Sequence, residues 1–83
     1  MHATVPRNEL GAILMMAELA YVTSKSLEII YLTDSSIALA CMLNTNIQLR
    51  AYTFARVQAS RRLIQMTTGL ENIPIYHIDG DKI

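Results

Sequence analysis

The chain has 83 residues, 52% of them hydrophobic and 17% charged, and its seven basic side chains balance its seven acidic ones. This length allows one domain at most and is close to the lower limit for a self-sufficient core. The hydrophobic content and the zero net charge exclude an intrinsically disordered chain. They also give no overall electrostatic attraction to nucleic acid or to a membrane.

The single cysteine and the longest apolar stretch bear on whether the chain belongs to an oxidising compartment or to a membrane. Cys41 is the only cysteine, so the chain cannot form an internal disulfide and nothing indicates an oxidising compartment. The longest apolar stretch, around Leu10 to Val22, is interrupted by Glu18 and is shorter than the ~20 residues of a membrane span. We therefore expect Cys41 to be a small apolar residue in a helix and the chain to have no membrane partner.

The first predicted element is a helix from about Asn8 to Thr23. Its apolar residues recur at intervals of three and four, the period of one helix face, and further apolar residues fill much of the remaining surface. Pro6 suits the start of this helix because its missing N–H is not needed in a first turn. A helix that is apolar on most sides predicts packing between two partners.

A strand and a short helix follow. The residues from Leu27 to Thr33 are mostly apolar and rich in β-branched and aromatic side chains, which predicts a strand buried on both faces, as in parallel sheets. Ser35 to Leu43 is predicted to be a short helix, with Asp34 or Ser35 as its N-cap.

The last elements are a longer helix and a second strand. Gln48 to Thr67 is predicted to be helical, and Gly69 is a suitable stop after it. Ile73 to Ile78 predicts a strand whose proline lies near its start, where a missing donor is tolerated, and residues 79–81 predict a turn. The expected apolar stripe of the long helix consists of Leu49, Tyr52, Ala55 or Arg56, Ala59, Leu63 and Met66.

The order helix, strand, helix, helix, strand indicates an α/β fold. A helical connection between the two strands implies parallel neighbours joined by a right-handed crossover. Two parallel strands with three flanking helices make a poor sheet by themselves, because parallel sheets are usually larger and covered on both faces. The sequence therefore predicts a piece of a larger α/β domain.

Two carboxylates are candidates for a shared site. Ligands of open α/β sheets bind outside the carboxyl ends of the strands, where Asp34 lies. Glu9 is in the first turn of the first helix and comes close to Asp34 if that helix runs antiparallel to the first strand. Paired carboxylates favour a cation between them, and Mg²⁺ prefers such oxygen ligands. The alternative is structural, with Asp34 as an N-cap and Glu9 compensating a helix dipole.

Four short segments resemble the ribonuclease H domain of retroelement polyproteins, most closely the Bel/Pao type. Val5-Pro6-Arg7-Asn8-Glu9-Leu10 is similar to the "VPRLEL" helix start of these elements, and Thr33-Asp34-Ser35 to their "TDS" strand end. Phe54-Ala55-Arg56-Val57 is similar to an "ANRV"-like helix segment, and His77-Ile78-Asp79-Gly80 to an "HVPG" segment. The four segments occur in the family's order and span nearly the whole chain.

The resemblance implies a fold, an activity and a site. The family fold is a mixed five-stranded sheet flanked by helices, and its activity is hydrolysis of the RNA strand of RNA–DNA hybrids. Four carboxylates hold two Mg²⁺ or Mn²⁺ ions, and the resemblance assigns the second carboxylate to Glu9 and the third to Asp34 as catalytic and metal-binding residues. It places Arg7 at a position that faces the nucleic-acid backbone, with a solvated surface charge as the alternative, and it makes His77 a structural strand-end residue.

The resemblance also implies a setting. Expected partners are the RNA–DNA hybrid and the reverse transcriptase and integrase parts of the same polyprotein. The expected location is intracellular, in the cytoplasm or in a virus-like particle.

Departures from the family pattern limit what the chain is expected to do. Residues 1–83 correspond to one partial ribonuclease H-like domain that lacks the first strands and the terminal helix, and with them the first and fourth carboxylates. We therefore expect the isolated chain to be inactive. Two alternatives remain open: a non-catalytic ribonuclease H-like interaction module or domesticated remnant, and an unrelated small α/β protein with a capping Asp34.

Four arginines on the long predicted helix could contact phosphates, or they could simply be solvated. Arg61 and Arg62 cannot share a face because adjacent helical residues lie ~100° apart. The four residues are Arg50, Arg56, Arg61 and Arg62.

Overall fold

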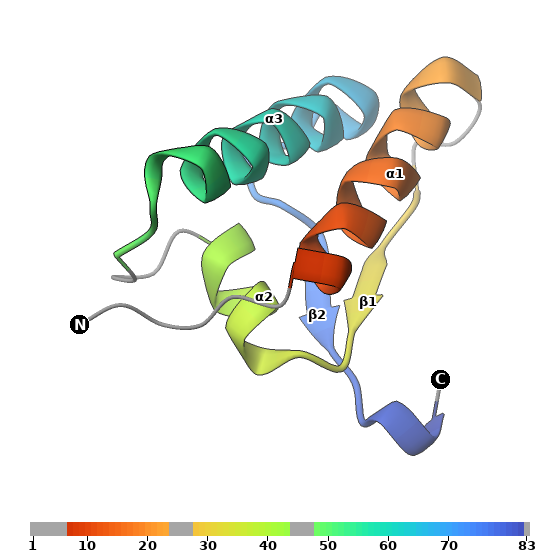
Figure 1. Ribbon diagram of the computed structural model, residues 1–83. Coiled ribbons are helices and arrows are strands. Elements are labelled where there is room, and N and C mark those ends of the chain that lie inside the picture. The colour runs from red at the N-terminus through yellow and green to blue at the C-terminus, as the bar shows by residue number, and fades with distance from the viewer. Residues whose placement is uncertain (1–6, 24–27, 44–47, 83) are drawn as a thin grey trace.

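The computed structural model describes residues 7–23, 28–43 and 48–82. Figure 1 shows the elements in these ranges, three α-helices, two strands and one short 3-10 helix. Their order confirms the predicted helix, strand, helix, helix, strand arrangement of a mixed α/β chain. The elements are α1 (Arg7–Thr23), β1 (Tyr31–Thr33), α2 (Ser36–Met42), α3 (Ala51–Thr68), β2 (Ile75–His77) and η1 (Gly80–Lys82).

The two strands form one parallel sheet, as the helical crossover predicted. Leu32 is the register partner of Tyr76. The N–H of Tyr31 donates to the Pro74 carbonyl at 2.8 Å, and the N–H of Ile78 donates to the Thr33 carbonyl at 3.0 Å. Both strands are shorter than predicted: residues 28–30 lie outside β1, residues 73, 74 and 78 lie outside β2, and Leu27 is outside the described residues.

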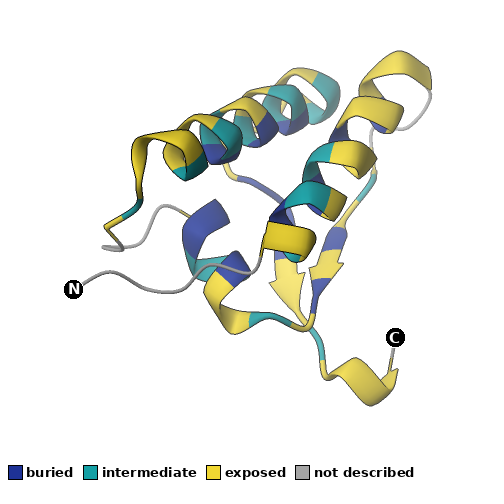
Figure 2. Ribbon diagram, viewed as in Figure 1, coloured by how far each residue is buried: buried dark blue, intermediate teal, exposed yellow. Residues whose placement is uncertain are grey.

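The helices cover one face of the sheet, and the core lies between them (Figures 1 and 2). Each of the three helices and both strands contribute to it, so β1 and β2 present alternate residues to the helices. The buried cluster consists of Leu10, Ile13, Ala17, Tyr31, Ala38, Cys41, Met42, Val57, Ile64, Ile73 and Ile75.

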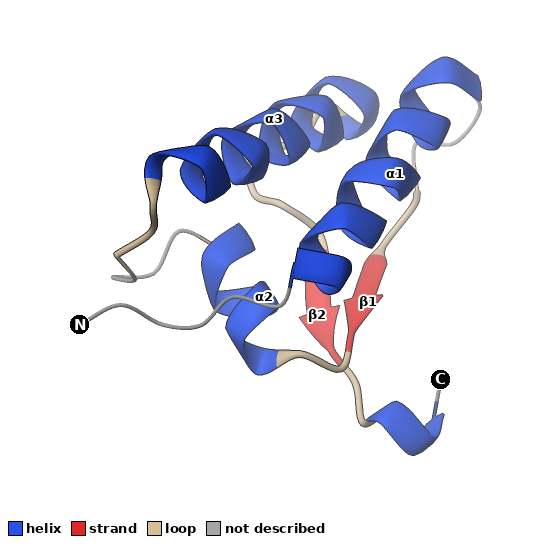
Figure 3. Ribbon diagram, viewed as in Figure 1, coloured by secondary structure: helices blue, strands red, loops and turns tan. Residues whose placement is uncertain are grey.

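Local hydrogen bonds fix the ends of α2 and α3, whose extent Figure 3 shows in blue. Ser35, not Asp34, is the N-cap of α2, because its Oγ accepts from the N–H of Ala38 at 3.1 Å. Gly69 ends α3 in the left-handed conformation, with φ of 72°, that glycine adopts without strain. The Arg61 guanidinium donates to the carbonyl of Met42, at the end of α2.

Two predictions about burial are wrong. The first strand is covered on one face only, because Leu32 is 44% exposed between the buried residues Tyr31 and Thr33. α1 is not packed between two partners, since Met15 is 70% exposed while Ile13 is buried. The apolar pattern identified the surfaces of β1 and α1 that favour burial. It could not show which of these surfaces pack against other elements in the described part of the chain.

α3 begins at Ala51 and turns a different face to the core than predicted. Its buried residues are Val57, Ser60 and Ile64, whereas Tyr52 and Met66 are exposed. Small and amphipathic side chains on several sides of this helix made its period ambiguous. Among the described helices, none has the length and apolar content needed to cross a membrane.

Candidate functional site at the end of the first strand

Glu9 lies against the carboxyl end of β1, as the sequence predicted. The hydroxyl of Thr33, the last residue of β1, donates to Glu9 Oε2 at 3.4 Å. The same hydroxyl oxygen accepts from the N–H of Ser35 at 3.1 Å. Thr33 is therefore held between the turn after β1 and the first turn of α1, and it brings a carboxylate from 24 residues away to the strand end.

Asp34 follows at the next position and has no capping role. Ser35 caps α2, so the Asp34 carboxylate is not committed to a helix N-terminus. Its side chain is exposed. A Cβ added to Gly80 would lie 2.8 Å from Asp34 Oδ2, so the absence of a side chain at Gly80 allows η1 to approach this carboxylate closely.

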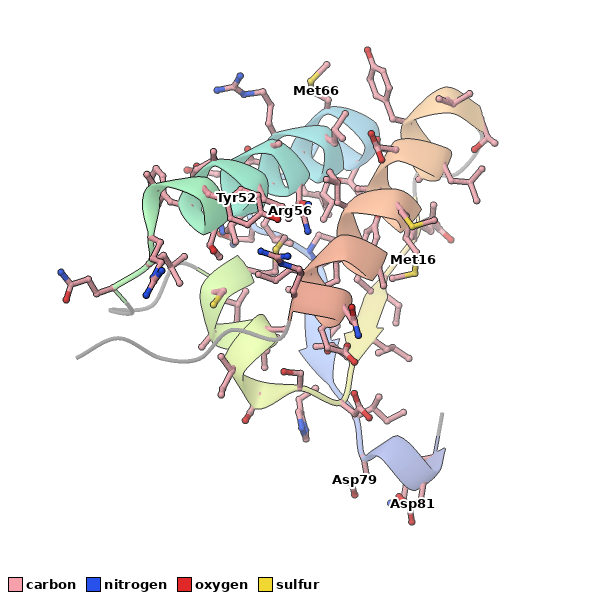
Figure 4. The ribbon with its side chains drawn as sticks, in the orientation of Figure 1. Met16, Tyr52, Arg56, Met66, Asp79 and Asp81 are labelled. Atoms are coloured by element: carbon pink, nitrogen blue, oxygen red, sulfur yellow. The ribbon has the colours of Figure 1, made fainter. Side chains whose placement is uncertain are left out.

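The end of β2 brings further polar residues to the same edge of the sheet. His77 is the register partner of Thr33, and partners in a parallel ladder project from the same face. Asp79 and Asp81 lie at η1, beyond the strand end, and Figure 4 shows them pointing away from the helices. Asp79 forms an ion pair with Lys82 at 3.9 Å between exposed side chains.

Glu9 and Asp34 carry the two carboxylates that the sequence assigned to a metal site, and the group that contacts Glu9 is the neutral hydroxyl of Thr33. Residues 7–23, 28–43 and 48–82 contain no group of three or more His, Cys, Asp or Glu side chains arranged to hold a metal ion. In general, Mg²⁺ binds proteins through one or two carboxylates and keeps several of its waters.

Comparison with protein-family models, with curated proteins and with solved structures found no significant match to the chain. The function of this edge must therefore be argued from its geometry and from the short sequence segments.

The arginines do not form a single phosphate-binding face. Arg61 is used to bind the end of α2, and Arg50 and Arg62 are exposed. Arg7, the first residue of α1, instead approaches α3: its guanidinium carbon lies 5.4 Å from the centre of the Tyr52 ring. Arg56 lies 5.2 Å from the same ring centre.

Sequence reasoning missed Tyr52, which it placed in an apolar stripe. The available signal was the spacing of Tyr52 and Arg56, because residues four apart on a helix are neighbours. The contact of Arg7 with the Tyr52 ring could not be predicted from the sequence, because it depends on how α1 and α3 pack.

Proposed function

We propose that the chain is the central part of a ribonuclease H-like domain from a retroelement polyprotein, a domain that hydrolyses the RNA strand of RNA–DNA hybrids. One observation carries the proposal: Glu9 contacts Thr33 at the carboxyl end of β1, directly before an exposed Asp34 that is not the cap of α2. The four ordered sequence segments support it, because two of them contain these acids. The arrangement also agrees with the rule that open α/β sheets bind ligands at strand ends.

Each residue has a separate role in this proposal. Thr33 orients the Glu9 carboxylate, and Gly80, which has no side chain, lets η1 lie beside the Asp34 carboxylate without a clash. Glu9 and Asp34 together would hold a divalent cation. In a complete domain a pair of such ions supplies an activated water and stabilises the leaving oxygen. The described residues provide two carboxylates for this purpose, so the chain on its own holds an ion weakly.

Metal binding is tested most directly by nuclear magnetic resonance with Mn²⁺. Titration of the folded chain should broaden the amide signals of Glu9, Thr33, Asp34 and Ser35 before any others, and excess Mg²⁺ should reverse the broadening. Asp34→Asn should abolish this selectivity. Glu18→Gln is the matched control, because Glu18 is an exposed acid of the same helix as Glu9. Uniform broadening, or broadening centred elsewhere, would remove the basis of the proposal.

Catalysis is tested separately by incubating the purified chain with a labelled hybrid in Mg²⁺. We expect no turnover, because a two-ion site needs more ligands than this edge supplies. Turnover that Asp34→Asn abolishes would contradict this expectation and would mean that the chain completes its own site.

A non-catalytic interaction module is the second candidate function. The outer face of the sheet favours it, because Leu32 and Tyr76 are exposed apolar neighbours there. The two candidates differ in the flanking coding sequence. An active parent needs an aspartate-bearing strand upstream of residue 1 and another aspartate soon after residue 83, whereas an interaction module needs neither.

A further inference from the structure

Two arginines from different helices share one tyrosine ring at the start of α1 and α3. The Arg7 guanidinium carbon is 5.4 Å from the centre of the Tyr52 ring, and that of Arg56 is 5.2 Å from it. Figure 4 shows the Tyr52 and Arg56 side chains of α3 lying together beside α1. Both distances are within the range of a cation–π contact. We call these three residues the arginine–tyrosine cluster.

The ring and α1 together restrict the position of Arg56. A Cβ added to Gly11 would lie 3.6 Å from an Nη of Arg56, so this guanidinium lies against the second turn of α1. Arg56 is half-buried, whereas Arg7 and Tyr52 are exposed. The cluster is therefore accessible, yet its charged groups are partly ordered before any ligand arrives, which lowers the entropic cost of binding.

The charge of the cluster is not balanced by the residues around it. Within the described part of the chain, neither Arg7 nor Arg56 forms an ion pair, whereas Lys82 pairs with Asp79. The tyrosine ring attracts the two guanidinium groups through its quadrupole, but it has no net charge and does not neutralise them. Guanidinium groups present fork-shaped sets of donors that match phosphate oxygens, so this arrangement favours an oxyanion with several oxygens.

From these observations we propose that the arginine–tyrosine cluster is a phosphate-binding site that takes a backbone phosphate of nucleic acid. Arg7 and Arg56 donate to the phosphate oxygens, and each guanidinium group is positioned by its contact with the Tyr52 ring. Arg7 is two residues from Glu9, which turns the two side chains ~200° apart around α1. Arg7 and Glu9 therefore lie on different sides of the start of α1, and a bound strand would pass over this helix start.

The assignment to nucleic acid rests on the proposed function, but binding of phosphate as such does not. Arginine side-chain nuclear magnetic resonance can test both, because each Nε–H signal reports on its own guanidinium group. The chain is titrated in one arm with inorganic phosphate and in another with a 12-base-pair RNA–DNA hybrid. We expect the Arg7 and Arg56 signals to move in both arms, and the Arg62 signal to move in neither.

Substitutions then measure the contribution of each residue to hybrid affinity. Arg7→Gln and Arg56→Gln should each weaken binding about tenfold at low salt, since a hydrogen bond to a charged group contributes about that factor. Each should also lower the slope of log affinity against log salt by about one. Arg62→Gln is the matched control on α3 and should change affinity less than about twofold. Tyr52→Phe keeps the ring and should bind like the parent.

Three results would overturn the proposal. If neither arginine signal moves in the parent chain, there is no phosphate site. If only inorganic phosphate moves them, the nucleic-acid assignment is wrong. If Arg62→Gln weakens hybrid binding as much as Arg7→Gln, the attraction is general charge. The Mn²⁺ titration of the carboxylate edge is read independently, so failure of the metal site would leave the phosphate result intact.

Discussion

The two faces of the sheet differ sharply although their sequences are similarly apolar. The inner face presents Tyr31, Thr33 and Ile75, all buried beneath the helices, whereas the outer face presents Leu32 and Tyr76, which are 44% and 55% exposed. The same contrast divides α1 into a covered and an open side. An apolar side chain is therefore not necessarily buried in this molecule. Its burial depends on whether a helix packs over it.

Truncation of a buried residue of α1 should change the free energy of unfolding more than truncation of an exposed one, and this is the largest difference we expect between covered and open surfaces. Ile13 is 2% exposed, and Ile13→Ala should lower the free energy of unfolding by about 3 kcal/mol, because the lost contacts leave a cavity. Met15→Ala, two residues along and on the open side, should change it by less than about 0.5 kcal/mol. Urea denaturation of both variants checks this. Equal losses would show that the open side of α1 is covered in solution.

The elements, their order and the parallel pairing could all be predicted from the sequence. Helical periodicity located α1 to within one residue at its start, and Gly69 marked the end of α3 because a left-handed stop favours glycine. The start of α1 and the end of α3 depend on neighbouring residues only. The lengths of the strands could not be predicted, because pairing stops where the partner strand diverges, which local sequence does not encode.

The candidate site was also predicted only in part, because some of its features depend on local sequence and others on contacts made in the folded chain. The chain position of Glu9 and Asp34 indicated that both acids belong to one edge, and the contact between Glu9 and Thr33 agrees with this. The sequence left the N-cap of α2 open between Asp34 and Ser35. Only the hydrogen bond from Ala38 to the Ser35 hydroxyl decides between them.

The junction between the sheet and α2 gives the next prediction. Ser35→Ala should lower the free energy of unfolding by about 1 kcal/mol, since it removes the acceptor for the Ala38 N–H. Ser36→Ala should have little effect because Ser36, the first residue of α2, is exposed and is not the N-cap. Asp34→Asn should also leave stability unchanged. A larger loss for Asp34→Asn than for Ser35→Ala, measured by thermal unfolding, would return Asp34 to a structural role.

Two tyrosines on opposite faces of the sheet allow a smaller and cleaner comparison. The Tyr31 hydroxyl is buried without a hydrogen-bond partner in the described part of the chain, so Tyr31→Phe should raise the free energy of unfolding by about 1 kcal/mol. Tyr76→Phe on the outer face should be neutral, because water solvates that hydroxyl equally in both states. A loss of stability in Tyr31→Phe would mean that the hydroxyl has a partner.

The same burial predicts how stability depends on pH. Burial raises the pKa of Tyr31 above 10.0 and the pKa of the Cys41 thiol above 9.0. Because the unfolded chain loses these protons first, their contribution is fully present below pH 9 and decreases as pH rises through the folded pKa values. Tyr31→Phe should remove the part of this decrease that occurs above pH 10, whereas Tyr76→Phe should not. Urea denaturation at pH 8, 9.5 and 10.5 checks this.

A charged residue on the outer face of the sheet should have the smallest effect on the free energy of unfolding. It tests directly whether that face is exposed to water. Leu32 lies between two buried residues of β1, yet its side chain projects away from the helices, so Leu32→Lys places an ammonium group in water. The free energy of unfolding should change by less than about 0.5 kcal/mol. Tyr31→Lys, one residue away, should unfold the chain because it buries an unpaired charge in the core. A loss above about 2 kcal/mol in Leu32→Lys would mean that the outer face is covered in solution. Sedimentation of the parent chain at several concentrations would then show whether a second copy covers it.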